Sequence, residues 1–190
     1  MRFLANIVIL LVTICSSTYA VTIRNYRTGT CKGGYAQCSN VSPTDCCDIS
    51  HNRVFSSSLF LGLPTTAIGA ICSRKGNLNC GTTQKAGHGL SLCLGKGNSR
   101  GSYWFDCRSC RKTEIDGGAI DLESMSEVNN ATSTVSPDII AIEDHQFNIG
   151  GDTPQHVTDG LIEHFYSDGD YSSVPEEYKI YELAELIGDD

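Results

Sequence analysis

The sequence predicts a small all-β, disulfide-rich domain followed by an acidic, partly disordered tail with one or two short helices. Residues 21–112 hold nine cysteines and carry twelve Lys or Arg against three acidic residues. Residues 113–190 hold no cysteine and carry one lysine against nineteen acidic residues. These segment charges of +9 and −18, which the whole-chain charge of −8 conceals, indicate two different kinds of chain.

The first 20 residues have the order of a secretory signal peptide. Arg2 precedes an apolar run at residues 3–14, and small residues follow up to Ala20, where we expect cleavage. A membrane-spanning helix requires roughly 20 apolar residues, more than this run provides. We therefore expect a secreted, extracellular protein without a membrane anchor.

The basic domain, residues 21–112, is predicted to consist of short strands, because β-branched, aromatic and cysteine residues predominate in five segments. Glycine and asparagine turns separate these segments. Residues 95–101, which contain three glycines, predict a hairpin turn. The expected strands lie at residues 21–27, 54–63, 67–73, 90–94 and 102–107.

Beyond the basic domain, residues 113–138 are predicted to form a disordered linker, because they contain few large apolar side chains to offset the entropy of ordering. Residues 139–190 are predicted to be an acidic tail or propeptide with amphipathic helices. Residues 156–166 have helical spacing of apolar side chains. A second helix is expected to open at Pro175, with two glutamates in its first turn.

The cysteines are expected to form disulfides, because the secretory route is oxidising. Cys15 leaves with the signal peptide, so an odd number remains. Four bridges and one cysteine that is unpaired or intermolecular are the simplest outcome, and the connectivity stays open. Neither a metal nor a cofactor is predicted. The remaining cysteines are Cys31, Cys38, Cys46, Cys47, Cys72, Cys80, Cys93, Cys107 and Cys110.

The spacing Cys31-x6-Cys38-x7-Cys46-Cys47 resembles the first half of an inhibitor cystine knot, a family of small secreted toxins and inhibitors. The likeness covers 17 residues, and it ends there because 24 residues separate Cys47 from Cys72. The adjacent cysteines also resemble those of hydrophobins, which have two such pairs. Neither likeness is taken as a family assignment.

An anion-binding surface is predicted in the basic domain. Lys96 and Arg100 belong to the predicted hairpin turn, whose backbone N–H groups favour a phosphate or sulfate. Tyr103 and Trp104 follow directly and are candidates for aromatic stacking or membrane insertion; the alternative is a strand that packs its rings inside. The other predicted anion-binding residues are Arg74, Lys75 and Arg53.

Catalysis has few candidates. The basic domain contains no glutamate, so it lacks the general acid or base that ribotoxins and many glycosidases use. His51 and His88, with a lysine such as Lys85, are the minor alternative of a ribonuclease-like pair. Residues 168–172 resemble the start of a calcium loop, but the later ligand positions do not match, so an acidic turn is expected. We therefore predict a protein that is not an enzyme.

Two further features concern processing. Asn40 and Asn130 lie in Asn-x-Ser/Thr sequons and are predicted to carry glycans. Arg111 and Lys112 form a dibasic pair between the last cysteine and the acidic residues. The order of signal, basic cysteine-rich part and acidic part resembles the layout of thionin-type precursors, and this likeness of layout implies cleavage after Lys112. The alternative is an attached acidic arm that binds a partner.

The leading functional hypothesis is a secreted cysteine-rich protein of toxin, effector or host-defence type, acting in virulence or defence by binding. Its expected partners are an anionic membrane, a cell-wall polymer or a host protein. The linker also permits intramolecular docking of the acidic tail, since opposite charges attract once they approach within roughly 8 Å. The alternative is an extracellular structural or adhesion protein, with a homodimer formed through the odd cysteine.

Overall fold

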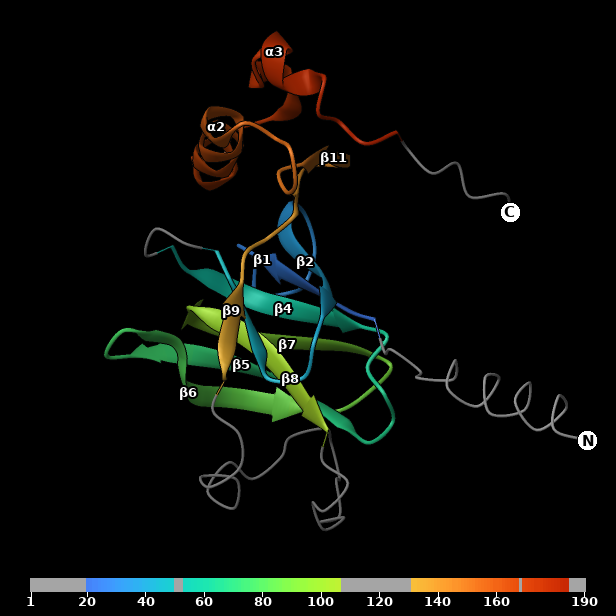
Figure 1. The fold of residues 1–190 in the computed structure, drawn as a ribbon, viewed down its shortest axis with the longest axis vertical. Coiled ribbons are helices and arrows are strands. Elements are labelled where there is room, and N and C mark those ends of the chain that lie inside the picture. Colours follow the sequence, from blue (N-terminus) through green and yellow to red (C-terminus); the bar gives the residue numbers. More distant parts are fainter. Residues whose placement is uncertain (1–19, 50–52, 107–130, 168, 185–190) are drawn as a thin grey trace, which may run out of the picture.

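The computed structural model describes residues 20–49, 53–106, 131–167 and 169–184 (Figure 1). Several sequence predictions lie outside the described residues. These are the signal peptide up to residue 19, the linker up to residue 130, and the individual residues His51, Cys107, Cys110, Arg111, Lys112 and Asn130.

The described chain is mostly β-strand, arranged in two sheets. The six-stranded sheet has the order β11 (His145–Asn148), β10 (Ile139–Ile142), β2 (Tyr35–Val41), β1 (Val21–Tyr26), β4 (Phe55–Leu61) and β7 (Ser91–Ser99). The five-stranded sheet has the order β6 (Leu78–Gly87), β5 (Ala67–Lys75), β8 (Gly101–Asp106), β3 (Asp45–Asp48) and β9 (Ser133–Val135). Neighbouring strands are antiparallel except β3 and β9, which are parallel. The predicted all-β, disulfide-rich character is confirmed; partial disorder of the tail stays a prediction.

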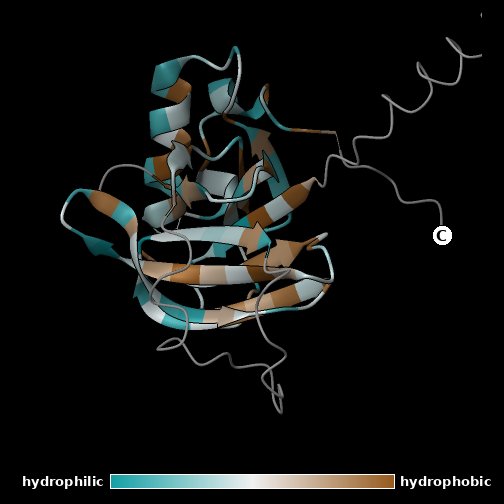
Figure 2. Ribbon diagram, turned by 60° about the horizontal axis from the view of Figure 1, so that its bottom comes forward, coloured by the Kyte–Doolittle hydropathy of each residue, from teal (hydrophilic) through white to brown (hydrophobic). Residues whose placement is uncertain are grey.

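The main hydrophobic core draws residues from both sheets and from the helix α2 (Gln155–Tyr166). In β1, Val21, Ile23 and Asn25 are fully buried while Thr22 and Arg24 are partly exposed, the period of two expected of a strand with one face on a core. Figure 2 shows hydrophobic and hydrophilic residues alternating along the strands and around α2. No helix in the described part of the chain is both long and apolar enough to cross a membrane.

The strand β8 lies between β5 and β3 in the second sheet, and side-chain clusters cover both of its faces. Trp104 packs in the main core, and its indole Nε1 donates a 2.8 Å hydrogen bond to the Val41 carbonyl. Tyr103 and Phe105 point to the other face and pack in a second cluster. When both faces of a strand are covered, polar and apolar residues do not alternate along it, so the sequence does not show which side chains are buried.

The predicted hairpin at residues 95–101 is wrong. Residues 95–99 belong to β7, which pairs with β4 in the six-stranded sheet, whereas β8 pairs with β5 and β3 in the other sheet. A hairpin requires its two strands to pair with one another. Arg100 instead connects the two sheets. Gly95 is needed for a close approach, since a Cβ there would lie 2.6 Å from the Gly29 carbonyl oxygen.

Part of the predicted linker and tail belongs to the sheets (Figure 1). β9 falls in the predicted linker and pairs with β3, so residues 133–135 are not an unstructured spacer. β10 and β11 fall in the predicted tail, and β10 pairs with β2. Backbone pairing with strands of the basic domain satisfies their N–H and C=O groups. The acidic half therefore contributes strands to both sheets.

Helices occur in the tail as the spacing predicted. α2 buries Val157, Leu161, Ile162 and Phe165 on one face. The 3₁₀ helix η2 (Tyr171–Ser173) follows, and α3 (Glu176–Lys179) starts directly after Pro175. α3 is much shorter than its apolar spacing suggests, because the chain leaves the helix to pair Glu182 with Phe147 of β11.

Candidate anion-binding site

Arginines from separate segments of the chain meet near Asp48 of β3. Arg100 Nη1 donates a 3.4 Å hydrogen bond to the Arg53 carbonyl. This bond connects the residues before β4 with Arg100, where the chain passes from one sheet to the other. The positive charges of Arg100 and Arg74 both act on the Asp48 carboxyl. Three of the five predicted anion-binding residues are therefore brought together, although they lie far apart in the sequence.

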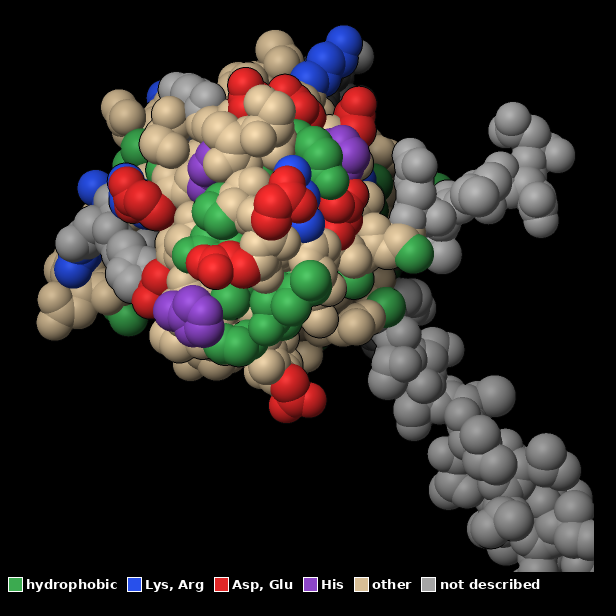
Figure 3. All heavy atoms as spheres, turned by 90° about the horizontal axis from the view of Figure 1, so that it is seen from above, with side chains coloured by type: hydrophobic (Ala, Val, Ile, Leu, Met, Phe, Trp, Pro, Cys, Tyr) green, Lys and Arg blue, Asp and Glu red, His purple; other side chains and the backbone are tan. Residues whose placement is uncertain are grey.

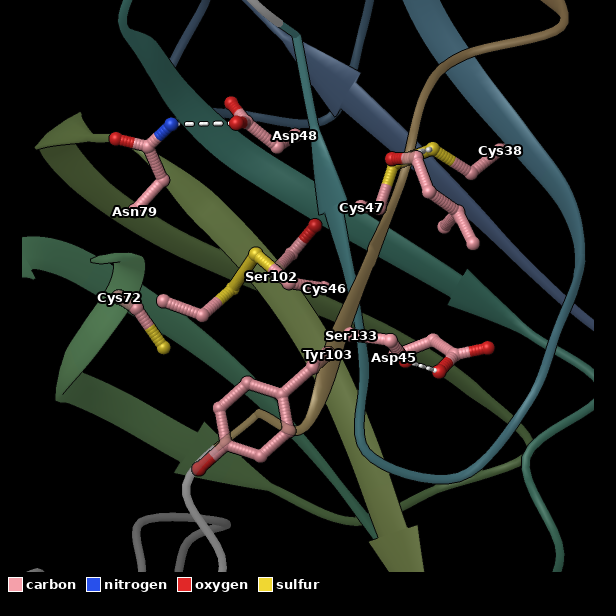
Figure 4. The surroundings of a disulfide bond; sticks show 12 residues. Cys38, Asp45, Cys46, Cys47, Asp48, Cys72, Asn79, Ser102, Tyr103 and Ser133 are labelled. Atoms are coloured by element: carbon pink, nitrogen blue, oxygen red, sulfur yellow. Dashed lines mark hydrogen bonds between the residues drawn. A yellow bond between two sulfur atoms is a disulfide. The ribbon is translucent and has the colours of Figure 1, made fainter. Parts of the chain in front are cut away.

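Asp48 is partly buried beneath these cations. Burial is the largest influence on its carboxyl and raises its pKa, while a hydrogen bond from Asn79 and the charges of Arg100 and Arg74 act in the opposite direction. Asn79 Nδ2 donates to Asp48 Oδ2, as Figure 4 shows. The other amide atom, Asn79 Oδ1, is buried and accepts no hydrogen bond in the described part of the protein.

The helix α2 from the acidic half rests on this basic surface. Arg53 forms an ion pair with Glu163, and its guanidinium lies 5.0 Å from the centre of the Tyr166 ring. Arg27 Nη1 donates a 2.7 Å hydrogen bond to the Phe165 carbonyl near the end of the helix. The C-terminal end of a helix carries partial negative charge, which favours a cation at this position. We call Arg27, Arg53, Arg74 and Arg100 the arginine cluster.

Tyr166 adds a hydrogen-bond donor to the arginine cluster. Its hydroxyl is buried and has no hydrogen-bond partner among the described residues. Burial raises the pKa of this phenol, while the nearby charges of Arg53 and Arg27 act against that shift. The hydroxyl therefore stays protonated at physiological pH and can donate one hydrogen bond.

The two predicted anion-binding lysines lie elsewhere. Lys75 ends β5 and Lys96 lies in β7, and both side chains are exposed. Within the described ranges, neither side chain forms a hydrogen bond or ion pair with the arginine cluster. Lys75 and Lys96 therefore lie outside the arginine cluster, and anion binding by these two lysines stays a prediction.

The predicted aromatic contact residues are in the core instead of at the surface. Tyr103 is 3% exposed and Trp104 is 2% exposed. Tyr103 stacks with Phe105 at a ring-centre distance of 5.8 Å. These rings therefore cannot insert into a membrane or stack on a base in this structure, and the alternative of inward packing is the one observed.

Three disulfides brace the described fold: Cys31–Cys93, Cys38–Cys47 and Cys46–Cys80. Cys72 is unpaired and fully buried, beside the Cys46–Cys80 bridge in the second cluster (Figure 4). Its burial raises the pKa of the thiol to about 12. Cys72 is therefore out of reach of a second chain in this fold, and the predicted intermolecular bond finds no support in this residue.

The remaining predicted sites are placed as follows. His88 is exposed after β6, and Lys85 Nζ donates a 3.4 Å hydrogen bond to the Gly95 carbonyl. Asn40 is exposed in β2, where a glycan can attach without entering the core. Within the described part of the chain, no group of three or more His, Cys, Asp or Glu is placed to hold a metal ion.

The sequence reasoning missed four residues of this site: Arg27, Asp48, Asn79 and Tyr166. Arg27 was assigned only to the end of the first predicted strand, and Asp48 was one of three acidic residues in a basic domain. That rarity was the only available signal, because an acid retained among so many cations is often paired or buried. Tyr166 was assigned only to an amphipathic helix.

The chain matches the model of one known protein family. The family model ARB_05566_N, described as an N-terminal domain, matches residues 22–138. No curated protein and no solved structure matches the chain. The matched range extends from β1 through β9, so it crosses the predicted linker and ends just before β10. Because the match covers more than half of the 190 residues, the chain belongs to the ARB_05566_N family.

Proposed function

We propose that this is a secreted, cysteine-rich binding protein of toxin, effector or host-defence type whose arginine cluster engages an anionic target. The observation that carries the proposal is the convergence of guanidinium groups from separate segments around Asp48 and Tyr166. Arg53 pairs there with the Glu163 carboxylate, and the charges of Arg74 and Arg100 act on the Asp48 carboxyl. Guanidinium groups bind carboxylate, sulfate and phosphate through paired hydrogen bonds.

Among the expected partners, an acidic polysaccharide such as a cell-wall polymer is favoured over a membrane. The burial of Tyr103 and Trp104 removes the aromatic groups that membrane insertion would use. An acidic polysaccharide presents carboxylate or sulfate groups, which guanidinium groups bind through paired hydrogen bonds.

Binding of the full-length secreted chain to polygalacturonate and to a heparin oligosaccharide tests this proposal. The variant R53Q/R100Q should weaken binding at least about tenfold, since hydrogen bonds to charged groups contribute roughly 1.5–3 kcal/mol each. The matched control K75Q/K96Q removes two cations outside the arginine cluster and should change affinity less than about twofold. Binding should also fall as salt is raised from 50 to 300 mM.

Three outcomes would count against the proposal. Equal losses in both double variants would mean that net charge, rather than the arginine cluster, controls binding. Binding only to phosphatidylserine vesicles would replace the polysaccharide by a membrane. Failure of the wild-type chain to bind any of these probes would remove the anionic target altogether.

Secretion and the fate of the acidic half are part of the same proposal. The disulfides are typical of an oxidising compartment, which supports export. The intact mass of the protein secreted from a eukaryotic host, measured with and without reduction and deglycosylation, tests both points. A fragment ending at Lys112 would indicate processing, and a doubled mass that halves on reduction would favour the structural or adhesion alternative.

A further inference from the structure

The ion pair between Arg53 and Glu163 occupies the arginine cluster with a carboxylate from the chain itself. Glu163 projects from α2 with 67% of its side chain exposed, whereas the Arg53 side chain is 34% exposed. The Arg53 guanidinium also lies over the Tyr166 ring, which restricts the plane in which its N–H groups can donate. Glu163 therefore holds the position that an incoming anionic group would need.

The helix does not depend on this ion pair for its placement. Four apolar residues of α2 are buried, and the Arg27 hydrogen bond to the Phe165 carbonyl fixes the end of the helix. An exposed ion pair contributes only about 0.2–1 kcal/mol. The Glu163 side chain can therefore turn into solvent while the backbone of α2 stays in place.

We propose that Glu163 is a built-in competitor for Arg53, displaced when a carboxylate or sulfate group of an acidic polysaccharide binds. This inference rests on the proposed function: at the same site, Glu163 would regulate the binding of the anionic target. The incoming group takes the guanidinium N–H donors that Glu163 releases. Target binding then opposes a contact within the protein, so removal of the Glu163 charge should strengthen binding.

The test compares E163Q with E177Q in the full-length chain. Both variants remove one glutamate charge, but Glu177 is an exposed residue of α3 and forms no ion pair with the arginine cluster among the described residues. E163Q should bind about two- to fivefold more tightly, the range that an exposed ion pair allows. E177Q should match the wild type. Polygalacturonate presents carboxylates and the heparin oligosaccharide presents mainly sulfates, so the two probes separate the two ligand groups.

A double-mutant cycle makes the test specific to Arg53. In the R53Q background, E163Q should add no further change in affinity, because the competing contact is already gone. Thermal unfolding of each variant checks that all chains are folded. If wild type binds but E163Q and E177Q bind equally, or if E163Q binds more weakly, the competition is overturned while the proposed function stands. If no variant binds either probe, the proposed function itself fails.

Discussion

The guanidinium of Arg53 pairs with the carboxylate of Glu163, which lies 110 residues later and in the half of opposite charge. Figure 3 views the molecule from the side of α2 and α3 and shows acidic side chains distributed over that face. The contact is one of several that join the two halves, since β9 and β10 also pair with strands of the basic half.

A cut within residues 113–130 should leave the two fragments associated. β10 pairs with β2, β9 pairs with β3, and Ile140, Phe147 and Leu161 of the acidic half are fully buried in the main core. Separation would expose this apolar surface to water. An engineered protease site in that range, followed by size-exclusion chromatography, checks the expectation. Separate elution in native buffer would contradict it, and separation in urea confirms that the chain was cut.

Replacing Asn25 by alanine should destabilise the protein by about 3 kcal/mol. Asn25 is fully buried between the sheets, and its Oδ1 accepts hydrogen bonds from Ser58 Oγ at 2.6 Å and Ser102 Oγ at 2.8 Å. The variant leaves two buried hydroxyls without their acceptor. Urea unfolding measures the loss. The exposed residue Thr65 provides a control, because T65A should change stability by less than about 0.5 kcal/mol; equal effects would refute the role of the network.

The Cys72 thiol should resist alkylation in the folded protein. Burial raises its pKa to about 12, so almost none of it is the reactive thiolate at pH 8. Iodoacetamide labelling followed by peptide mapping should find Cys72 unmodified in native buffer. The same labelling in urea without reductant should modify it fully. Native labelling at the rate of an exposed thiol would show that this part of the second sheet opens.

Acid should weaken the attachment of the C-terminal segment through Glu182. Its carboxylate accepts a 2.6 Å hydrogen bond from His145 Nδ1 and a 2.8 Å hydrogen bond from the Tyr171 hydroxyl. The His145 hydrogen bond is the main reason that the pKa of Glu182 is lowered, with Tyr171 and Lys179 acting in the same direction. A lowered folded-state pKa means that the stabilisation is complete above the ordinary glutamate pKa and is lost as pH falls through the folded value.

E182Q should therefore flatten the acid dependence of stability. Between pH 5 and 3, the melting temperature of the wild type should fall more steeply than that of E182Q, because the variant has no carboxylate to protonate. E177Q is the matched control, since it removes an exposed glutamate of α3, and it should follow the wild type. Parallel curves for the wild type and E182Q would contradict the role of this carboxylate.

The elements that the sequence predicted well are those with a local signal. α2 agrees with its predicted range to within one residue, because the helical period is contained in the segment itself. The segments predicted as strands correspond to β1, β4, β5, β7 and β8. β3 was missed because its four residues are two aspartates and two cysteines, which carry little strand preference. Its place in the sheet depends on pairing with β8 and β9.

The sequence also left the site incomplete. It marked Arg53, Arg74 and Arg100 as cations but placed Arg100 in a hairpin with Lys96, because a glycine-rich stretch predicts a turn. It offered Tyr103 and Trp104 as surface groups because the order of aromatic residues in a strand does not reveal whether both faces are covered. The two side-chain clusters that cover the faces of β8 bury both rings and exclude that reading.

Composition and local periodicity were sufficient for the all-β class, the disulfide-rich character and the helix α2, since each depends on residues close together in the chain. The tertiary structure decided the disulfide pairing, the burial of Cys72 and the arginine cluster around Asp48. It also joined the acidic half to both sheets. These features depend on contacts between distant segments, and many chain arrangements satisfy the same local pattern until packing and backbone pairing select one.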